Sequence, residues 1–298
     1  MRLKGKIITG KWNKNQYKVM GILGEGGTGT VYKVLDIKSK LYHALKVSED
    51  LQSITKESNR LVEFSDINSI PNCIELDDYE EDGKTYYFIV IDYINGQNFK
   101  EYILKNKLDL REIVGIVIII GEMINDLHGR GYIFADLKLE NIMVDREKGK
   151  IRVIDLGGVV QIDSSIKEFT PLYDRARWNM GARKADTGYD LFALCMMMVN
   201  LIIKDEKKLI RMTVADIVYE LKTRRINRDL VELLKRGLYQ KRIEFSEFTS
   251  ELKKIYKTLR FKRKIGYNDR VNLVINTFFI GTALSFFTIL IIIIKEIL

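Results

Sequence analysis

The chain has 298 residues, of which 46% are hydrophobic and 30% charged, so it can bury a substantial core in one large domain or in two lobes. The formal net charge at pH 7 is +9, with much of the excess after residue 222, which favours an anionic neighbour such as a membrane surface or a nucleic acid. Cys73 and Cys195 are isolated and the two histidines lie far apart, which argues against a disulfide framework and a Cys/His metal site. No signal peptide is expected, because the first residues, MRLKGKIITGKW, lack an apolar stretch.

Residues 17–33 predict a β-hairpin with a glycine-rich turn, because apolar residues alternate on both sides of a glycine cluster in YKVMGILGEGGTGTVYK. Gly24, Gly26 and Gly29 form a G-x-G-x-x-G pattern, and glycine lets backbone N–H groups approach phosphate oxygens without a Cβ in the way. In dinucleotide-binding proteins this pattern opens a helix, whereas here a strand-like segment, TVYKVLDI, follows it. The stretch predicts a phosphate-binding hairpin, and a glycine-rich hairpin without a ligand is the alternative.

The segments that follow are typical of a strand, a helix, a second strand and a second helix. Residues 41–47 form a β-like run with Lys46 as a charged insertion near its end, and residues 53–64 have helical apolar spacing. Residues 85–96, TYYFIVIDYING, predict a buried strand that runs into a turn. The chain is hydrophobic all round from 113 to 120, which predicts a buried helix, since eight residues are too few to span a bilayer.

Two acids, an amide and a lysine stand at the ends of short apolar runs between residues 132 and 158. The run YIFADLKLENIMV contains Asp136, Lys138 and Asn141, and IRVIDLGG delivers Asp155 and two glycines. Asp136 has the chemistry to take or orient a hydroxyl proton, while Asn141 and Asp155 offer the hard oxygen ligands that Mg²⁺ prefers. The stretch predicts a site that holds Mg²⁺ beside a nucleophile, and a solvated turn with scattered charges is the alternative.

The remainder of the chain predicts helices. Residues 190–203 begin with an aspartate and are then apolar all round, and residues 214–256 carry apolar and charged residues at helical spacing. Residues 273–294 are 22 residues without a charge, which at about 1.5 Å per residue reach roughly 33 Å, enough to cross the ~30 Å hydrocarbon core of a bilayer. Basic side chains crowd the segment before this span, and the positive-inside rule places that side in the cytosol.

The glycine-rich hairpin, the strand lysine and the FADLKLEN and DLG segments occur in the order typical of eukaryotic-type (Hanks-type) protein kinases, which this chain resembles over roughly residues 12–258. The resemblance implies an α+β, two-lobed protein-kinase-like fold with ATP between the lobes. The small β-rich N-lobe would cover about 12–94 and the larger helical C-lobe about 95–258. With a basic juxtamembrane segment at 259–272 and a transmembrane helix at 273–294, the chain looks like a tail-anchored bacterial serine/threonine kinase.

The resemblance assigns the phosphoryl-transfer chemistry to four residues. Asp136 is the implied residue that orients the substrate hydroxyl. Lys138 is the second implied catalytic residue and matches the lysine that steadies the transferred phosphate in serine/threonine kinases. Asn141 and Asp155 are the implied ligands of Mg²⁺ or Mn²⁺.

The implied ATP-binding residues lie in the glycine loop, on the next strand, on the following helix and at the hinge between the lobes. They are Gly24, Glu25, Gly26, Gly29, Val31, Ala44, Lys46, Glu57, Asp92 and Ile94. Lys46 is expected to face the α- and β-phosphates and to pair with a glutamate of the helix. Glu57 is the preferred partner and Glu63 the alternative.

Several residues depart from the family pattern. Ala135 replaces the arginine before the catalytic aspartate, so activity is not expected to depend on phosphorylation of the segment 155–171. Leu156 replaces the phenylalanine of D-F-G. The A-P-E motif is absent, and Asp174 is a candidate substitute for its glutamate, which in the family pairs with an arginine that Arg242 resembles.

These features predict a serine/threonine protein kinase that uses ATP and Mg²⁺ and phosphorylates protein substrates from the cytoplasmic face of the cell membrane. The alternative is a pseudokinase scaffold that binds nucleotide and partners at the membrane without efficient turnover. The basic stretches after residue 222 also suit nucleic-acid phosphates, but attraction to anionic lipid beside the predicted span explains them more simply.

Overall fold

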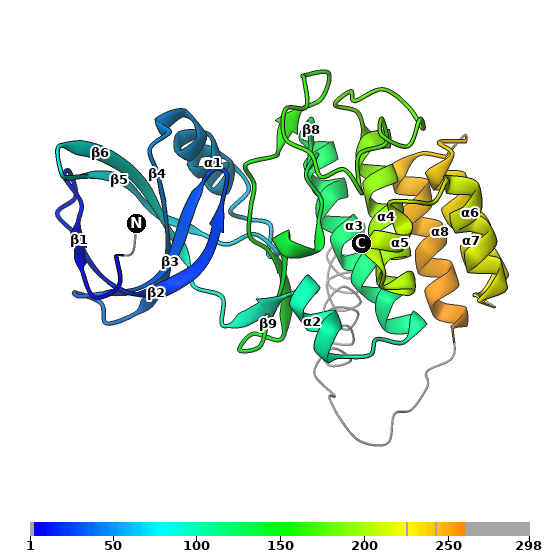
Figure 1. Cartoon of the computed structure of the whole chain (residues 1–298), viewed down its shortest axis with the longest axis horizontal. Helices are drawn as coiled ribbons and strands as arrows, with labels where there is room; N and C mark the ends of the chain where they lie inside the picture. Colours follow the sequence, from blue (N-terminus) through cyan, green and yellow to red (C-terminus); the bar gives the residue numbers. More distant parts are fainter. Residues whose placement is uncertain (1–2, 225, 242, 260–298) are drawn as a thin grey trace, which may run out of the picture. The chain divides into compact units, whose positions relative to one another are not determined.

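The computed structural model describes residues 3–224, 226–241 and 243–259 (Figure 1). These residues form two compact units. The β-rich unit comprises residues up to 96 together with 141–143 and 152–159, and the helical unit comprises 97–140, 144–151 and the chain from 160 onward. The predicted combination of a mainly β part and a mainly helical part is confirmed.

The β-rich unit is organised on a six-stranded antiparallel sheet with the spatial order β1-β2-β3-β4-β6-β5. The strands are β1 (Ile7–Thr9), β2 (Gln16–Gly26), β3 (Gly29–Asp36), β4 (Tyr42–Ser48), β5 (Cys73–Glu81) and β6 (Lys84–Asp92). The predicted hairpin at 17–33 is the β2–β3 pair, which meets at Gly26 and Gly29. The predicted strands at 41–47 and 85–96 correspond to β4 and β6.

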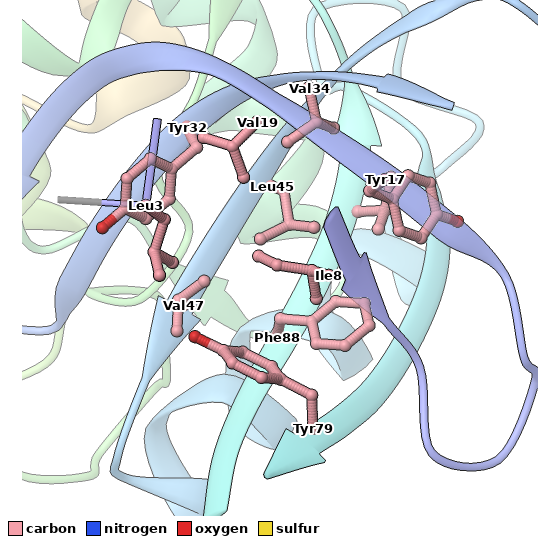
Figure 2. Close-up of a cluster of buried hydrophobic side chains, with 11 residues drawn as sticks. Leu3, Ile8, Tyr17, Val19, Tyr32, Val34, Leu45, Val47, Tyr79 and Phe88 are labelled. Carbon is pink, nitrogen blue, oxygen red and sulfur yellow. The ribbon is translucent and has the colours of Figure 1, made fainter. Parts of the chain in front are cut away.

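The two faces of this sheet carry different side chains, because neighbouring residues of a strand point to opposite faces. One face carries the apolar core of the unit, drawn in Figure 2. This core consists of Leu3, Ile8, Tyr17, Val19, Tyr32, Val34, Leu45, Val47, Tyr79, Phe88 and Val90. On the other face, Val31 pairs with Lys46 and Lys46 with Ile89 across the strands. Lys46 therefore lies on the face of the sheet opposite this core.

Strand β1 is an addition to the elements that the sequence predicts. It has three residues, too few for alternation to be recognised, although Ile8 points into the core. The turn after it is held by Asp77, whose carboxylate accepts the backbone N–H groups of Trp12 at 3.0 Å and Asn13 at 2.8 Å. A Cβ on Gly10 would lie 2.3 Å from Asp77 Oδ2, so a side chain at this position would displace the carboxylate that holds the turn.

Helix α1 (Leu51–Glu63) begins two residues before the predicted helix at 53–64 because Asp50 caps it. The carboxylate of Asp50 accepts the backbone N–H of Gln52 at 2.9 Å and that of Ser53 at 3.2 Å, which satisfies two of the free donors at a helix start. Its buried face includes Ile54, Ser58 and Leu61 together with one acid, Glu57.

The helical unit is built around two helices that are buried on nearly all sides, as the sequence predicts. They are α3 (Leu110–Gly129) and α4 (Thr187–Ile203), which lie side by side with α7 (Arg228–Leu238) and α8 (Phe245–Thr258) packed against them (Figure 1). Asp109 and Glu112 form a capping box at the start of α3. The smaller helices are α2 (Phe99–Lys105), α5 (Glu206–Leu209) and α6 (Val214–Thr223).

Short strands connect these elements. A three-stranded sheet has the order β10-β9-β7, and a two-stranded sheet pairs β11 with β8. Their bounds are β7 (Gly96–Asn98), β8 (Tyr132–Ile133), β9 (Ile142–Asp145), β10 (Lys150–Val153) and β11 (Val160–Gln161), with the 3₁₀ turn η1 (Leu139–Asn141) before β9. The candidate site residues between 132 and 158 therefore lie in or next to the short strands β8, β9 and β10.

Among the described residues, no helix has both the length and the apolar surface needed to cross a bilayer. The predicted span at 273–294 lies outside these residues, as do Arg242 and nearly all of the basic segment at 259–272.

Candidate active site

A buried ion pair joins β4 to α1. The ammonium Nζ of Lys46 lies 2.5 Å from Glu57 Oε2, and the two residues are 6% and 2% exposed. Lys46 Nζ also lies 3.9 Å from Asp155 Oδ1. Glu63, the alternative partner, pairs instead with Arg60 at 2.6 Å on the surface of α1. The position of Glu57 on the buried face of the helix decides the pairing, because a lysine buried on a sheet can reach only that face.

The metal-ligand candidates Asn141 and Asp155 both belong to the β-rich unit. Their segments are hydrogen-bonded, since the backbone N–H of Ile154 donates to Asn141 O at 3.0 Å. Asp155 Oδ1 accepts the backbone N–H of Gly157 at 2.9 Å, and its side chain remains 34% exposed. The carbonyl oxygen of Gly157 in turn accepts Lys56 Nζ at 2.7 Å.

This donor set fits Mg²⁺ shared with a nucleotide. Among the residues that the structure describes, no group of three or more His, Cys, Asp or Glu side chains could hold a metal ion by itself. One amide and one carboxylate leave most of an octahedral shell to phosphate oxygens and water, which is how Mg²⁺ is usually bound. Asn141 and Asp155 would supply the protein oxygens.

The glycine-rich turn leaves its backbone accessible. A Cβ at Gly24 or Gly26 would meet no heavy atom within 4 Å, so these positions face open space that phosphate oxygens could use. Gly29 is required for a different reason. Its φ is +138°, and a Cβ there would lie 2.2 Å from the carbonyl oxygen of Val47 on β4. Glu25, between the first two glycines, pairs with Thr30 across the hairpin.

Two of the predicted ATP-binding residues, Val31 and Ala44, lie on the same sheet face as Lys46. Val31 is directly opposite Lys46 in the β3–β4 register, and Ala44 is two residues before Lys46 on β4. At the end of β6, the carboxylate of Asp92 is bonded to Asn72 and to Arg152 Nη2 at 3.3 Å. Ile94, the second residue predicted at the hinge, is 7% exposed.

The predicted catalytic aspartate lies in the helical unit and is 6% exposed. Lys138 Nζ is paired with Asp136 Oδ2, and Thr170 Oγ1 donates to Asp136 Oδ1 at 2.9 Å. The contact with Thr170, 34 residues away in sequence, was not predicted. The carboxylate of Asp136 is therefore oriented by a cation on one oxygen and a hydroxyl on the other.

Asp190 fixes the backbone that leads to this aspartate. Its carboxylate accepts the N–H of Phe134 at 2.7 Å and that of Ala135 at 2.9 Å, and it lies 2.9 Å from His128 Nε2. Ala135 has a φ of +62°, a conformation that needs such support in a residue with a side chain. The contact between Asp190 and His128 was not predicted, because the two residues lie 62 positions apart in the sequence.

Two crossed ion pairs hold the segment between Thr170 and α4. Arg183 Nη2 lies 2.6 Å from Asp174 Oδ2, and Arg175 makes a bidentate pair with Asp186 at 2.7 and 2.6 Å. Burial by itself would raise the pKa of Asp174, but hydrogen bonds from Arg183 and from the backbone of Ala176 hold that pKa below its ordinary value. Asp174 is therefore already paired within the segment, whereas Arg242 lies outside the described residues.

The site residues thus form two groups, one in each unit. The β-rich unit brings together Lys46, Glu57 and Asp155, with Asn141 on a neighbouring segment. The helical unit brings Lys138 and Thr170 to Asp136.

Comparison with known proteins gives a family match over most of the chain. The model of the protein kinase domain matches residues 17–262. Serine/threonine-protein kinase YabT of Bacillus subtilis (strain 168) is 39% identical over 209 residues, which cover 68% of this chain and 61% of YabT. Serine/threonine-protein kinase PrkC of the same organism is 26% identical over 213 residues, covering 66% of this chain and 32% of PrkC. Serine/threonine-protein kinase pkn3 of Myxococcus xanthus is 30% identical over 166 residues, covering 52% of this chain and 30% of pkn3. The chain therefore spans less than two thirds of the length of each of these relatives.

Proposed function

Because this chain belongs to the protein kinase domain family, we propose that it is an ATP-dependent serine/threonine protein kinase. The observation that carries the proposal is the buried pair of Lys46 and Glu57 with Asp155 at 3.9 Å from the lysine. A lysine held in this way is a fixed positive charge beside a carboxylate that suits Mg²⁺. This combination serves the binding of nucleotide phosphates.

The proposed reaction moves the γ-phosphoryl group of ATP to a protein hydroxyl. The hydroxyl oxygen forms a bond to the γ-phosphorus, and the bond from that phosphorus to the bridging oxygen of ADP breaks. Asp136 orients the hydroxyl and accepts its proton, and Lys138 stabilises charge on the transferred group. Lys46 binds the remaining phosphates. Mg²⁺ held by Asn141 and Asp155 would neutralise charge on the phosphate oxygens.

Serine and threonine are the proposed acceptor residues. Lys138, two residues after Asp136, is the residue that favours serine/threonine over tyrosine in the resemblance, and the three relatives above are named serine/threonine-protein kinases. The substrates are proteins of unassigned identity.

We also propose that the chain is anchored in the cell membrane by residues 273–294, with the kinase domain in the cytosol. The support is in the sequence: 22 uncharged residues follow a segment rich in lysine and arginine. That basic segment would face the anionic lipids of the cytoplasmic leaflet.

The test is a phosphorylation assay of the full chain, kept in mild detergent, with radiolabelled ATP and a mixture of protein substrates. We expect Mg²⁺-dependent label on serine and threonine, abolished by EDTA, with the sites identified by mass spectrometry. Nucleotide binding without any transfer would support the pseudokinase scaffold instead. Label on tyrosine alone would contradict the proposed acceptor class.

A further inference from the structure

Arg152 is a buried arginine that the proposed phosphoryl transfer does not use. It lies on β10, three residues before Asp155, and is 5% exposed. Its Nη2 donates to the carbonyl oxygen of Ile70 at 3.0 Å and to Asp92 Oδ2 at 3.3 Å. A buried guanidinium is costly unless it is paired and hydrogen-bonded, and an apolar side chain would fill the same space without that cost. The guanidinium of Arg152 therefore connects β10 to Ile70 and to Asp92 by hydrogen bonds.

Asp92 joins three segments of the β-rich unit at one carboxylate oxygen. Besides Arg152 Nη2, its Oδ2 accepts the backbone N–H of Asn72 at 3.1 Å and the side-chain amide of Asn72 at 3.0 Å. The backbone N–H of Asp92 donates back to Asn72 O at 3.1 Å. The end of β6, the segment that enters β5 and strand β10 are thus tied together.

The same set of contacts continues to the metal-binding segment. The backbone N–H of Val153 donates to Ser69 O at 2.7 Å, and that of Ile154 donates to Asn141 O at 3.0 Å. Three successive residues are therefore fixed, Arg152 by its side chain and the next two by their backbone. Asp155 follows directly, so the place of its carboxylate depends on this anchored backbone.

We propose that Arg152 and Asp92 are positioning residues that hold Asp155 where it binds the metal ion of Mg²⁺–ATP. The inference rests on the proposed function, because it takes Asp155 as a metal ligand. Arg152 acts through the backbone of residues 152–155. Asp92 acts through its side chain, a role separate from the contact with ATP that the sequence predicts for it at the hinge. The hinge and the metal ligand then share one rigid frame, which sets the distance between adenine and metal.

The test measures how strongly Mg²⁺ tightens nucleotide binding in the full chain, kept in mild detergent. The dissociation constant of ADP is determined with Mg²⁺ and with EDTA, and the ratio of the two values is the readout. Arg152→Met is expected to lower this ratio about 10-fold, the range found when partners behind a metal ligand are removed. The dissociation constant of ADP in EDTA should change little, because ADP binding without a metal ion does not need Asp155. Asp92→Asn should lower the ratio in the same direction, since it removes the negative charge that pairs with Arg152 and leaves a weaker acceptor for the donors of Asn72.

Hydrogen exchange in the metal-free protein gives a second readout, which does not depend on activity. The amides of Val153 and Ile154 should exchange faster in Arg152→Met than in the wild type. Arg146→Met is the matched control, because Arg146 is on the same hairpin but donates to Gln97 Oε1 at 3.0 Å. This control should keep the wild-type ratio and exchange rates.

A folded Arg152→Met variant with the wild-type ratio would overturn the inference. If that variant does not fold, Arg152→Lys and Asp92→Asn decide the matter by the same ratio, and wild-type values in both would overturn it. An equal fall in Arg146→Met would also overturn it. If Mg²⁺ does not tighten ADP binding to the wild type, the proposed function itself fails. If Mg²⁺ tightens binding to the wild type and to Arg152→Met equally, only the inference about Arg152 fails.

Discussion

At the scale of single residues, the charged side chains of the candidate site are oriented by ion pairs and hydrogen bonds. The effect expected of a substitution therefore depends on the charge or contact that it removes. Asp155→Asn keeps the shape of the side chain but removes the charge offered to Mg²⁺, and Asp136→Asn removes the proton acceptor. Each should lower kcat/KM for peptide phosphorylation by on the order of 100-fold or more, about 3 kcal/mol of transition-state stabilisation. Steady-state rates of the full chain check this. Wild-type turnover in Asp155→Asn would contradict the kinase mechanism.

The pair of Lys46 and Glu57 gives a second prediction, with a control on the same helix. Glu57→Gln leaves the buried ammonium beside a neutral amide, so Lys46 loses its orientation. We expect kcat/KM for ATP to fall by about 10- to 100-fold, roughly 1.4–2.7 kcal/mol. Glu63→Gln makes the same chemical change at a surface pair, where ion pairs contribute little, and should stay within about twofold of the wild type. Equal losses in both variants would contradict the role of Glu57.

At the scale of elements, the segment that leads to α4 carries its own countercharges. Arg175 is paired with Asp186 and Arg183 with Asp174, and Ala135 offers no charge beside the catalytic aspartate. A phosphate on Ser164 or Ser165, in the preceding segment 155–171, would therefore find these arginines already engaged. The double variant Ser164→Ala/Ser165→Ala should keep activity within about twofold of the wild type after phosphatase treatment.

That prediction is checked on an external substrate. Thr170 is left unchanged, because its hydroxyl donates to Asp136 and its loss would act on the site directly. A large loss in the double variant, restored by aspartate at the same positions, would show that phosphorylation of the segment controls activity.

The pair of Asp174 and Arg183 predicts a pH-dependent contribution to stability. The folded-state pKa of Asp174 lies below its ordinary value of 3.8, because hydrogen bonds from Arg183 and Ala176 outweigh the effect of burial. A depressed carboxyl pKa adds stability above the unfolded-state pKa, and this stability is lost as the pH falls toward the folded-state pKa. Asp174→Asn should thus cost about 1–3 kcal/mol at pH 7, and the difference from wild type should shrink below about pH 4.

Denaturant unfolding of both proteins at pH 7 and pH 3.5 checks this sign. Asp163→Asn is the control, because Asp163 is exposed and its pair with Lys184 lies on the surface. It should change stability by less than about 0.5 kcal/mol. A destabilisation of Asp174→Asn that grows as the pH falls would contradict the argument.

The elements that the sequence predicts correctly are those with a local signal. The glycines of the hairpin and the apolar runs of α3 and α4 each specify their structure within a few residues. Strand β1 was not predicted, because three residues are too few to show the alternation of apolar and polar side chains that is typical of a strand. The contacts of Asp136 with Thr170 and of His128 with Asp190 escape it because the partners are far apart in sequence. Arg152 did have a signal in the sequence, because it is a charged residue between the apolar residues Ile151 and Val153 of β10.

At the scale of the whole molecule, the family match stops at residue 262, and the strongest unassigned feature of the sequence follows it. Residues 273–294 are mostly apolar and carry no charge, and lysines and arginines are concentrated in the short stretch before them. A chain with this arrangement is expected to bring its kinase domain to the membrane surface, which would limit its substrates to proteins that reach that surface.

The last prediction tests this placement. Leu284→Lys and Phe287→Lys put two charges in the middle of the proposed span, and each costs about 2.5–3.5 kcal/mol of insertion free energy. The double variant should move from the membrane fraction to the soluble fraction while keeping its phosphorylation rate, because the span contributes no residue to the site. Lys295→Leu, at the end of the span, is the matched control and should remain in the membrane fraction.

Protease added to intact cells tests the orientation of the chain. It should leave the kinase domain undigested, whereas digestion would contradict the proposed cytosolic placement. Wild-type protein in the soluble fraction would contradict the proposed membrane anchor. The proposed kinase activity would be unaffected, because it rests on the residues of the site.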